Sequence, residues 1–151
     1  VMKTKEGKRW IYTLLTLLVM AAIWLFSSAD GTLSGSQSGM LARLLFWMEP
    51  DQASFLVRKT AHFTIYLILG FSMSGALKEW GLKHRGWRLL LTVLCCFLYA
   101  CSDEWHQTFV AGRAGQFRDV CLDTAGSLTG SLLQLPVWQH HWRRKSGPAC
   151  G

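Results

Sequence analysis

Long apolar runs separated by short polar segments dominate the chain. Residues 10–26 contain no charged side chain and are about 25 Å long as a helix at ~1.5 Å per residue, enough to cross most of a bilayer. Further spans are predicted at residues 56–77, 87–105 and 120–138, although the third ends in an acidic pair and the fourth contains Asp123. The pattern predicts an all-α membrane protein, with four transmembrane helices in a compact bundle.

The segment between the first two spans, residues 27–54, is expected to form an outer loop. Its first part is rich in glycine and serine, whereas apolar residues recur at helical spacing from Met40 to Met48. This spacing predicts a short interfacial helix on the outer leaflet, which Pro50 should end. A lid packed on the bundle, without a role at the membrane surface, fits the same pattern.

Composition and charge support a membrane protein and set its orientation. Half of the residues are hydrophobic, and the net charge is +7. The basic residues adjoin the apolar runs and do not form a single patch with interleaved aromatics, so no nucleic-acid partner is expected. Eleven of the sixteen Lys and Arg residues fall on one predicted side. The positive-inside rule then predicts a multi-pass protein with both termini cytoplasmic.

The predicted domain organisation is one transmembrane domain, residues 10–138, between basic cytoplasmic tails at 1–9 and 139–151. The basic start, the first apolar run and Ser27-Ser28-Ala29 also fit a cleavable signal peptide. Cleavage would leave the orientation of the remaining spans unchanged.

Charged and polar residues gather toward the predicted outer side. An acidic residue at a span centre costs about 2.5–3.5 kcal/mol on insertion scales, so it usually faces the bundle. Polar and small residues recur three or four apart on the last three spans, which should turn these stripes inward. The inward residues near the outer interface are then His62, Tyr66, Asp103, Gln107, Asp119 and Asp123, with Gly112 and Arg113 in the loop above them. Gly126 and Gly130 form a small-x-x-x-small pair that suits close helix contact.

Three interpretations of this polar cluster stay open. The first is a structural network in which Arg58, Lys59, Arg113 and Arg118 neutralise the carboxylates and fix helix register. The second is a binding site in which Arg113 and Lys59 hold a carboxylate or phosphate. The third is catalysis, with His62, Asp103 and Glu104 as acid–base candidates.

Metal and cofactor motifs are not evident in the sequence. H-E-x-x-H is absent, no ligand spacing stands out around His62 or His106, and the five cysteines lack zinc-site spacing. The cysteines lie mostly in apolar runs, where free Cys behaves as a small hydrophobe. No metal and no cofactor are therefore predicted.

The polar motifs also carry a resemblance. R-K-T-A-H-F at residues 58–63, followed by Tyr66 and Gly70, resembles the R-K-x-A-H-F-x-x-Y-x-x-x-G signature of VanZ-like membrane proteins. The run from residue 103 to 130 is similar to the second motif of that family, D-E-x-x-Q-x-F-x-x-G-R followed by spaced Asp, Asn and Gly. The sequence departs from the family pattern at Asp123, where Asn is common. The resemblance covers residues 10–135.

The resemblance implies a protein of the bacterial cytoplasmic membrane, in a family named after an accessory protein in teicoplanin resistance. Residues and resemblance together give a set of candidate binding residues: Arg58, Lys59, His62, Tyr66, Asp103, Glu104, Gln107, Gly112, Arg113, Asp119 and Asp123. Besides the lipid bilayer, the expected partner is a lipid-linked cell-wall component or an amphiphilic, glycopeptide-type antibiotic. The expected function is recognition of this ligand at the outer membrane face, which would contribute to antibiotic resistance. The alternatives are an integral-membrane hydrolase or transferase acting on an envelope lipid, and a structural partner in an envelope complex.

Overall fold

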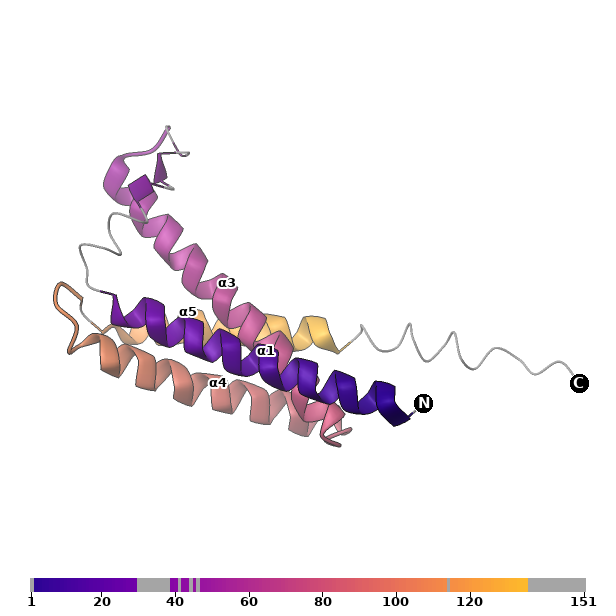
Figure 1. Ribbon diagram of the computed structural model, residues 1–151. Helices are drawn as coiled ribbons and strands as arrows, with labels where there is room; N and C mark the ends of the chain where they lie inside the picture. The colour runs from indigo at the N-terminus through magenta and orange to yellow at the C-terminus, as the bar shows by residue number, and fades with distance from the viewer. Residues whose placement is uncertain are drawn as a thin grey trace, which may run out of the picture.

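The computed structural model consists of helices joined by turns and loops in the part of the chain that it describes. That part comprises residues 2–29, 39–40, 42–43, 45, 47–113 and 115–135. Its helices are α1 (Met2–Ser28), α3 (Pro50–Glu79), α4 (Arg85–Gln107) and α5 (Phe117–Gln134), as Figure 1 shows. No strand occurs among these residues, which confirms the predicted all-α class.

Three of these helices are long and apolar enough to cross a membrane: α1 from Glu6 to Ser28, α3 and α4. They contain the first three predicted spans. The shorter α5 has 18 residues and carries Arg118, Asp119 and Asp123 among them, so its composition does not mark it as a span. The fourth transmembrane span therefore stays a prediction.

The second predicted span lies within a longer helix. α3 begins at Pro50, where a missing N–H costs nothing because the first helical N–H groups have no partner in the helix. Asp51 follows in the first turn, where the helix dipole favours an acidic side chain. Pro50 thus starts α3. Whether it also ends the predicted interfacial helix stays open, because residues 41, 44 and 46 of that helix lie outside the described residues, as does the predicted tail at 139–151.

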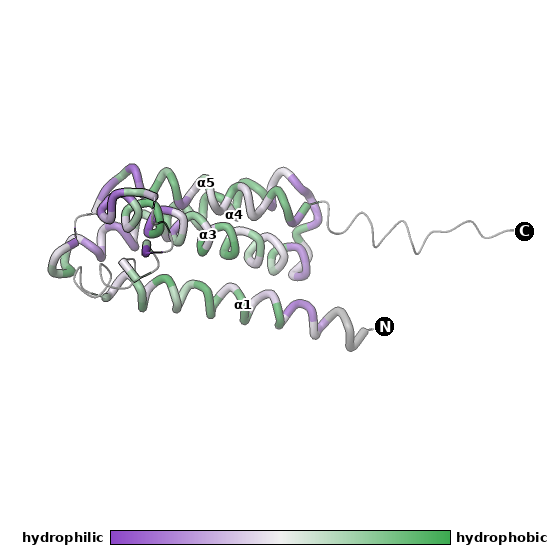
Figure 2. The backbone as a smooth tube through the Cα atoms, turned by 90° about the horizontal axis from the view of Figure 1, so that it is seen from above, coloured by the Kyte–Doolittle hydropathy of each residue, from purple (hydrophilic) through white to green (hydrophobic). Residues whose placement is uncertain are grey.

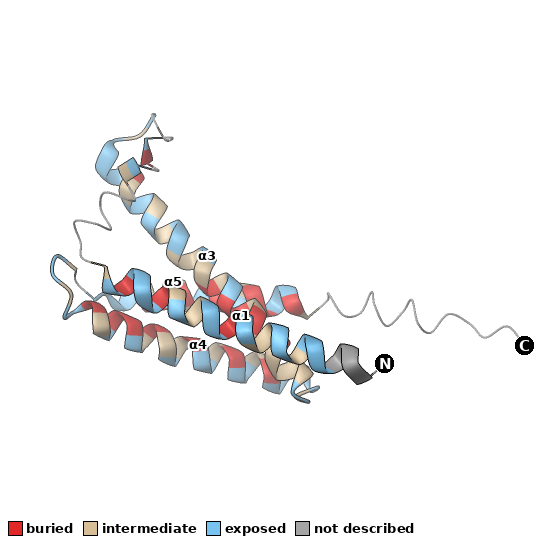
Figure 3. Ribbon diagram, in the orientation of Figure 1, coloured by how far each residue is buried: buried red, intermediate tan, exposed pale blue. Residues whose placement is uncertain are grey.

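The distribution of side chains is the reverse of that in a soluble bundle. Polar residues fill the interior, and six of the described ones are fully buried: Ser72, Ser74, Thr92, Asp123, Ser127 and Ser131. Leucines face outward, including Leu17, Leu18, Leu25, Leu94 and Leu98. Buried and exposed residues alternate along the helices in Figure 3, while Figure 2 shows the most hydrophilic stretches toward the helix ends. This arrangement is typical of helices that face lipid.

Small residues bring α3 and α5 into close contact. A Cβ on Gly126 would lie 2.5 Å from the Phe63 carbonyl oxygen. A Cβ on Gly130 would overlap the Leu67 carbonyl, and one on Gly70 would overlap the backbone of Ser127. The two helix backbones therefore touch directly, as the Gly126–Gly130 pair predicted.

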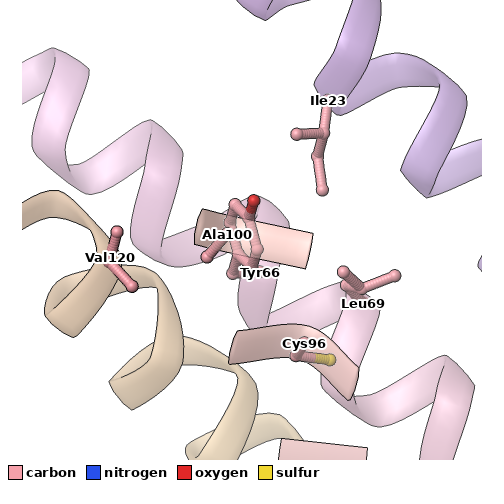
Figure 4. Close-up of a cluster of buried hydrophobic side chains, with 6 residues drawn as sticks. All are labelled: Ile23, Tyr66, Leu69, Cys96, Ala100 and Val120. Carbon is pink, nitrogen blue, oxygen red and sulfur yellow. The ribbon is translucent and has the colours of Figure 1, made fainter. Parts of the chain in front are cut away.

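α1 and α4 complete the bundle around this pair. A small apolar cluster draws on all four helices: Ile23, Tyr66, Leu69, Cys96, Ala100 and Val120 (Figure 4). Near the other end of α1, Trp10 packs edge-to-face on Trp80 at 5.9 Å between ring centroids. The Tyr99 hydroxyl donates a 2.7 Å hydrogen bond to the Met20 carbonyl and so ties α4 to α1.

Candidate functional site

Four metal-ligand-type side chains from three helices meet at one end of the bundle. His62 lies in the fourth turn of α3, Asp103 and Glu104 close to the end of α4, and Asp123 in the second turn of α5. One ligand atom from each of the four lies within 4.8 Å of all the others. We call this set the carboxylate–histidine cluster.

The close contact between α3 and α5 explains how Asp123 reaches this position. Gly126 lies one helical turn after Asp123 and packs on the carbonyl of Phe63, which directly follows His62. A larger residue at 126 would hold the two helices apart at this level. The glycine therefore lets Asp123 Oδ1 come to 3.6 Å from His62 Nδ1.

Asp123 is fully buried without a hydrogen-bond partner. Its relative exposure is 0%, and neither carboxylate oxygen accepts a hydrogen bond from a described residue. Asp103 is 3% exposed, and its Oδ1 also lacks a partner among these residues. Buried polar atoms are normally satisfied, so unsatisfied ones call for a specific explanation.

A second set of groups holds the α4 carboxylates in place. The Gln107 side-chain amide donates to Asp103 Oδ2 at 3.1 Å and to Glu104 Oε1 at 3.3 Å. The backbone N–H of Gln116 donates to Glu104 Oε2 at 2.8 Å. These bonds orient both carboxylates and leave Asp103 Oδ1 uncommitted, which is how supporting hydrogen bonds fix ligands around a site.

Tyr66 lies one turn beyond His62 on α3. Its side chain is fully buried, and its hydroxyl has no hydrogen-bond partner among the described residues. The ring packs on Tyr99, with 6.4 Å between centroids. The sequence stripe therefore placed Tyr66 correctly in the interior, next to the cluster.

The basic residues that were predicted beside the cluster either contact other groups or lie at the surface. Lys59 forms an ion pair with Asp119, which joins α3 to α5 beside the cluster. Arg113 Nη2 donates a 3.0 Å hydrogen bond to the Phe26 carbonyl, one of the last carbonyls of α1. Arg58 is exposed, and Gly112 occupies a turn with φ of +73°, a conformation that suits glycine.

The structure thus divides the predicted site residues into two groups. His62, Asp103, Glu104 and Asp123 converge, with Gln107 and Tyr66 beside them. Lys59 and Asp119 form a separate pair, while Arg58, Gly112 and Arg113 serve other positions. Sequence reasoning did not identify the Gln116 N–H and the Phe26 carbonyl, because backbone groups carry no residue-type signal.

The cluster contains three buried carboxyl groups and one partly exposed imidazole. His62 keeps 22% side-chain exposure while Asp123 behind it has none, so the imidazole is the accessible member of this pair. Such an arrangement can move protons, hold a cation, or orient a polar substrate.

Long apolar helices and an interior of small polar residues, with a buried carboxylate–histidine cluster among them, are typical of a helical membrane protein. The sequence model of the VanZ/LLP1 family matches residues 12–138, most of the chain. The chain therefore belongs to the VanZ/LLP1 family. No curated protein and no solved structure matches it.

Proposed function

We propose that this VanZ-family protein is an integral-membrane hydrolase or transferase that acts on an envelope lipid or a lipid-linked substrate. The observation that carries the proposal is the fully buried carboxylate of Asp123, whose Oδ1 lies 3.6 Å from Nδ1 of the more accessible His62 imidazole. In this role His62 exchanges a proton with the nucleophile or leaving group, and Asp123 orients the imidazole and stabilises its charge.

A purely structural role explains this cluster less well. A network that clamps helices pairs its charges, as Lys59 and Asp119 do. In the cluster, by contrast, three carboxyl groups share one imidazole, and Asp123 Oδ2 accepts no hydrogen bond from a described residue. Leaving such atoms unsatisfied costs stability, and proteins tolerate that cost mostly where the groups serve a function.

The α4 carboxylates fit supporting roles in the same chemistry. Gln107 and the Gln116 N–H hold Asp103 and Glu104 in fixed positions. Carboxyl groups so close to one another tend to differ in proton affinity, which lets one act as an acid while another acts as a base. By the count of Lys and Arg residues, this end of the bundle would face outward, where envelope lipids and cell-wall precursors are available.

The test is turnover by the purified protein in nanodiscs, with phospholipids and a polyprenyl-pyrophosphate-linked saccharide as probes. We expect His62→Asn and Asp103→Asn to lower turnover by about 10²–10⁴-fold, the usual contribution of a general acid or base. The matched control is Asp51→Asn, an exposed aspartate in the first turn of α3. Normal turnover in both cluster variants would contradict the proposal.

Recognition without turnover is the second candidate. The observation that favours it is an apolar groove of about 700 Å³ between Leu45 and the face of α3 that carries Leu56, Thr60 and Ile68. This groove could hold the acyl or prenyl chain of a lipid-linked cell-wall component or of an amphiphilic glycopeptide, and a role in antibiotic resistance would follow from such binding. Binding of a fluorescent polyprenyl lipid that Ala61→Trp blocks, with no turnover of any probe, would favour this candidate.

Most of the groove lining lies on another face of α3 than His62, although Ile65 lies near the face of His62. Residues two apart on a helix differ by about 200° in direction, which places His62 on the other side of α3 from Thr60. The residues predicted to bind an anionic ligand have protein partners instead. Lys59 pairs with Asp119, and Arg113 donates a hydrogen bond to the end of α1, which favours the enzyme over the recognition protein. These contacts leave the carboxylate–histidine cluster as the better-supported site.

A further inference from the structure

The carboxylate–histidine cluster has the composition of a cation site. Carboxylate oxygens and imidazole nitrogen are the protein ligands of divalent first-row metals. Here one histidine and three carboxylates, from three different helices, bring their ligand atoms within 4.8 Å of one another. We propose that His62, Asp103, Glu104 and Asp123 bind one divalent metal ion.

The ligand spacing is close to that of an occupied site. Metal–oxygen and metal–nitrogen bonds of about 2.0–2.2 Å place ligands on opposite sides of an ion roughly 4 Å apart. The separations here, 4.8 Å at most, need only small side-chain rotations to reach this value. His62 Nδ1 and Asp123 Oδ1, at 3.6 Å, already lie at a distance that one ion can bridge.

The unsatisfied oxygens are an independent indication of a missing ligand. Asp123 is fully buried, and both of its oxygens lack hydrogen-bond donors among the described residues. Asp103 Oδ1 and His62 Nδ1 are buried and unsatisfied in the same way. Asp123 Oδ1 and His62 Nδ1 lie 3.6 Å apart, and an ion between them and the other two carboxyl groups would give these atoms a partner.

The hydrogen bonds around the cluster match the support that metal ligands receive. Gln107 donates to the second oxygen of Asp103 and to Glu104, and the Gln116 N–H donates to the other oxygen of Glu104. Such donors orient ligating carboxylates, and each carboxylate oxygen keeps a second lone pair with which it can bind the ion. Asp123 has no such donor, so both of its oxygens are available to the ion.

Charge gives a further reason for an ion at this position. The nearest lysine, Lys59, is engaged with Asp119, and within the described ranges no other ion pair reaches the cluster apart from the His62–Asp123 contact. Several carboxylates in a low-dielectric interior require protons or a counter-charge. A divalent ion supplies two positive charges at the centre of the group.

The ligand set favours Mn²⁺ or Zn²⁺ over Ca²⁺. Calcium takes six to eight oxygen ligands in a wide site, whereas an imidazole favours first-row transition metals. Three carboxylates add the hard character that Mn²⁺ accepts well. The partial exposure of His62 leaves a route by which the ion and a substrate can enter.

This inference deepens the proposed function and rests on it for the role of the ion in turnover. A bound divalent ion lowers the pKa of a coordinated water and polarises a substrate oxygen. With the ion bound, His62 would be one of its ligands, and the ion-bound water would take over the proton exchange that the proposed function assigns to His62. Loss of His62 abolishes turnover in both cases, so ion binding must be measured separately from activity.

The experiment measures metal content and affinity of the full chain in nanodiscs. The protein is stripped with a chelator, titrated with MnCl₂, ZnCl₂ or MgCl₂, and analysed by elemental mass spectrometry and, for Mn²⁺, by electron paramagnetic resonance. We expect one Mn²⁺ or Zn²⁺ per chain, with affinity that falls at lower pH because protons compete for the ligands. Asp123→Asn and Glu104→Gln should weaken binding by at least about 10–100-fold, the loss typical of disturbing even a supporting residue.

Controls separate this site from adventitious binding. Asp51→Asn and Glu49→Gln remove the same types of charge from exposed positions and should retain native affinity. If a cluster variant fails to fold, the number of metal ions bound per native chain still tests whether the site exists. Less than a tenth of an ion per chain at saturation, or equal affinity in Asp123→Asn and Asp51→Asn, would overturn the inference.

Failure of the metal site and failure of the proposed function give different results. Turnover that persists in chelator-stripped protein removes the ion from the mechanism and leaves the enzyme assignment intact. Stoichiometric binding that the cluster variants abolish, without turnover of any probe, confirms the metal site and counts against the enzyme.

Discussion

Replacing Gly126 with alanine should push α5 away from α3 and destabilise the bundle. The new Cβ would lie 2.5 Å from the Phe63 carbonyl oxygen, whereas real Cβ atoms essentially never come within 3.0 Å of another heavy atom. The helices must therefore separate by about 0.5 Å or more at this point, and overpacking of this kind typically costs about 1–3 kcal/mol. The same shift would move Asp123 away from His62.

The matched control is Gly7→Ala in α1, where a new Cβ meets no heavy atom within 4 Å. Both substitutions gain helix propensity, about 1 kcal/mol per site, so the difference between them isolates the packing cost. We expect the free energy of unfolding, measured by detergent titration or steric trapping in bicelles, to be lower in Gly126→Ala than in Gly7→Ala by about 1–3 kcal/mol. Equal stability of the two variants would refute the close α3–α5 contact.

Three further predictions concern the ion pair, the attachment of α1 and the topology. Replacing Lys59 with methionine should destabilise the bundle by about 1–3 kcal/mol, between the values typical of exposed and buried pairs, and a double-mutant cycle with Asp119→Leu should recover part of the loss. Tyr99→Phe removes a 2.7 Å hydrogen bond to a carbonyl of α1, so thermal unfolding should show a loss of about 1 kcal/mol, and no loss would show that this bond does not hold α1. In a cysteine-free background, an impermeant maleimide should label Ala111→Cys but not Gly7→Cys in intact cells, and the reverse pattern would invert the predicted orientation.

Periodicity in the sequence was sufficient to predict the helices and the residues that they bury. The stripe of polar and small residues on the second span predicted that Tyr66 faces inward, and Tyr66 is buried. Gly126 and Gly130 were recognisable as a close-contact pair because small residues four apart on a helix have few other uses in a membrane. The buried stripe and the glycine pair depend only on the spacing of residues along one helix, and this spacing can be read from the sequence.

The contacts across the bundle were less accessible to sequence reasoning. Lys59 and Asp119 are sixty residues apart, and either could have paired with several other charges. Arg113 looked like an anion-binding residue but donates to the carbonyl of Phe26 at the end of α1. Which partner a long side chain reaches depends on the relative positions of helices, and short-range patterns do not specify these.

The proposed metal site could not be predicted from the sequence for the same reason. Known metal motifs place at least two ligands at a fixed spacing on one element. Here α4 supplies the adjacent residues Asp103 and Glu104, and the other two ligands come from α3 and α5. A pair of adjacent acidic residues is common in loops and helix ends, so its presence alone carried little information. The signal appears only once the free oxygens of Asp123 are seen next to His62.

Asp123 is also where this chain departs from the family pattern, which commonly has asparagine. An asparagine oxygen can still ligate a hard cation, but it contributes no negative charge and a single oxygen. Asp123→Asn should therefore retain a weakened site, whereas His62→Asn should change the selectivity of the site. Removing the imidazole leaves only oxygen ligands in the cluster, which shifts preference from Zn²⁺ toward Mg²⁺ and Mn²⁺. Competition titrations of the two variants against native protein would show this shift as a fall in the ratio of Zn²⁺ to Mg²⁺ affinity in His62→Asn alone, and an unchanged ratio would place the ion away from His62.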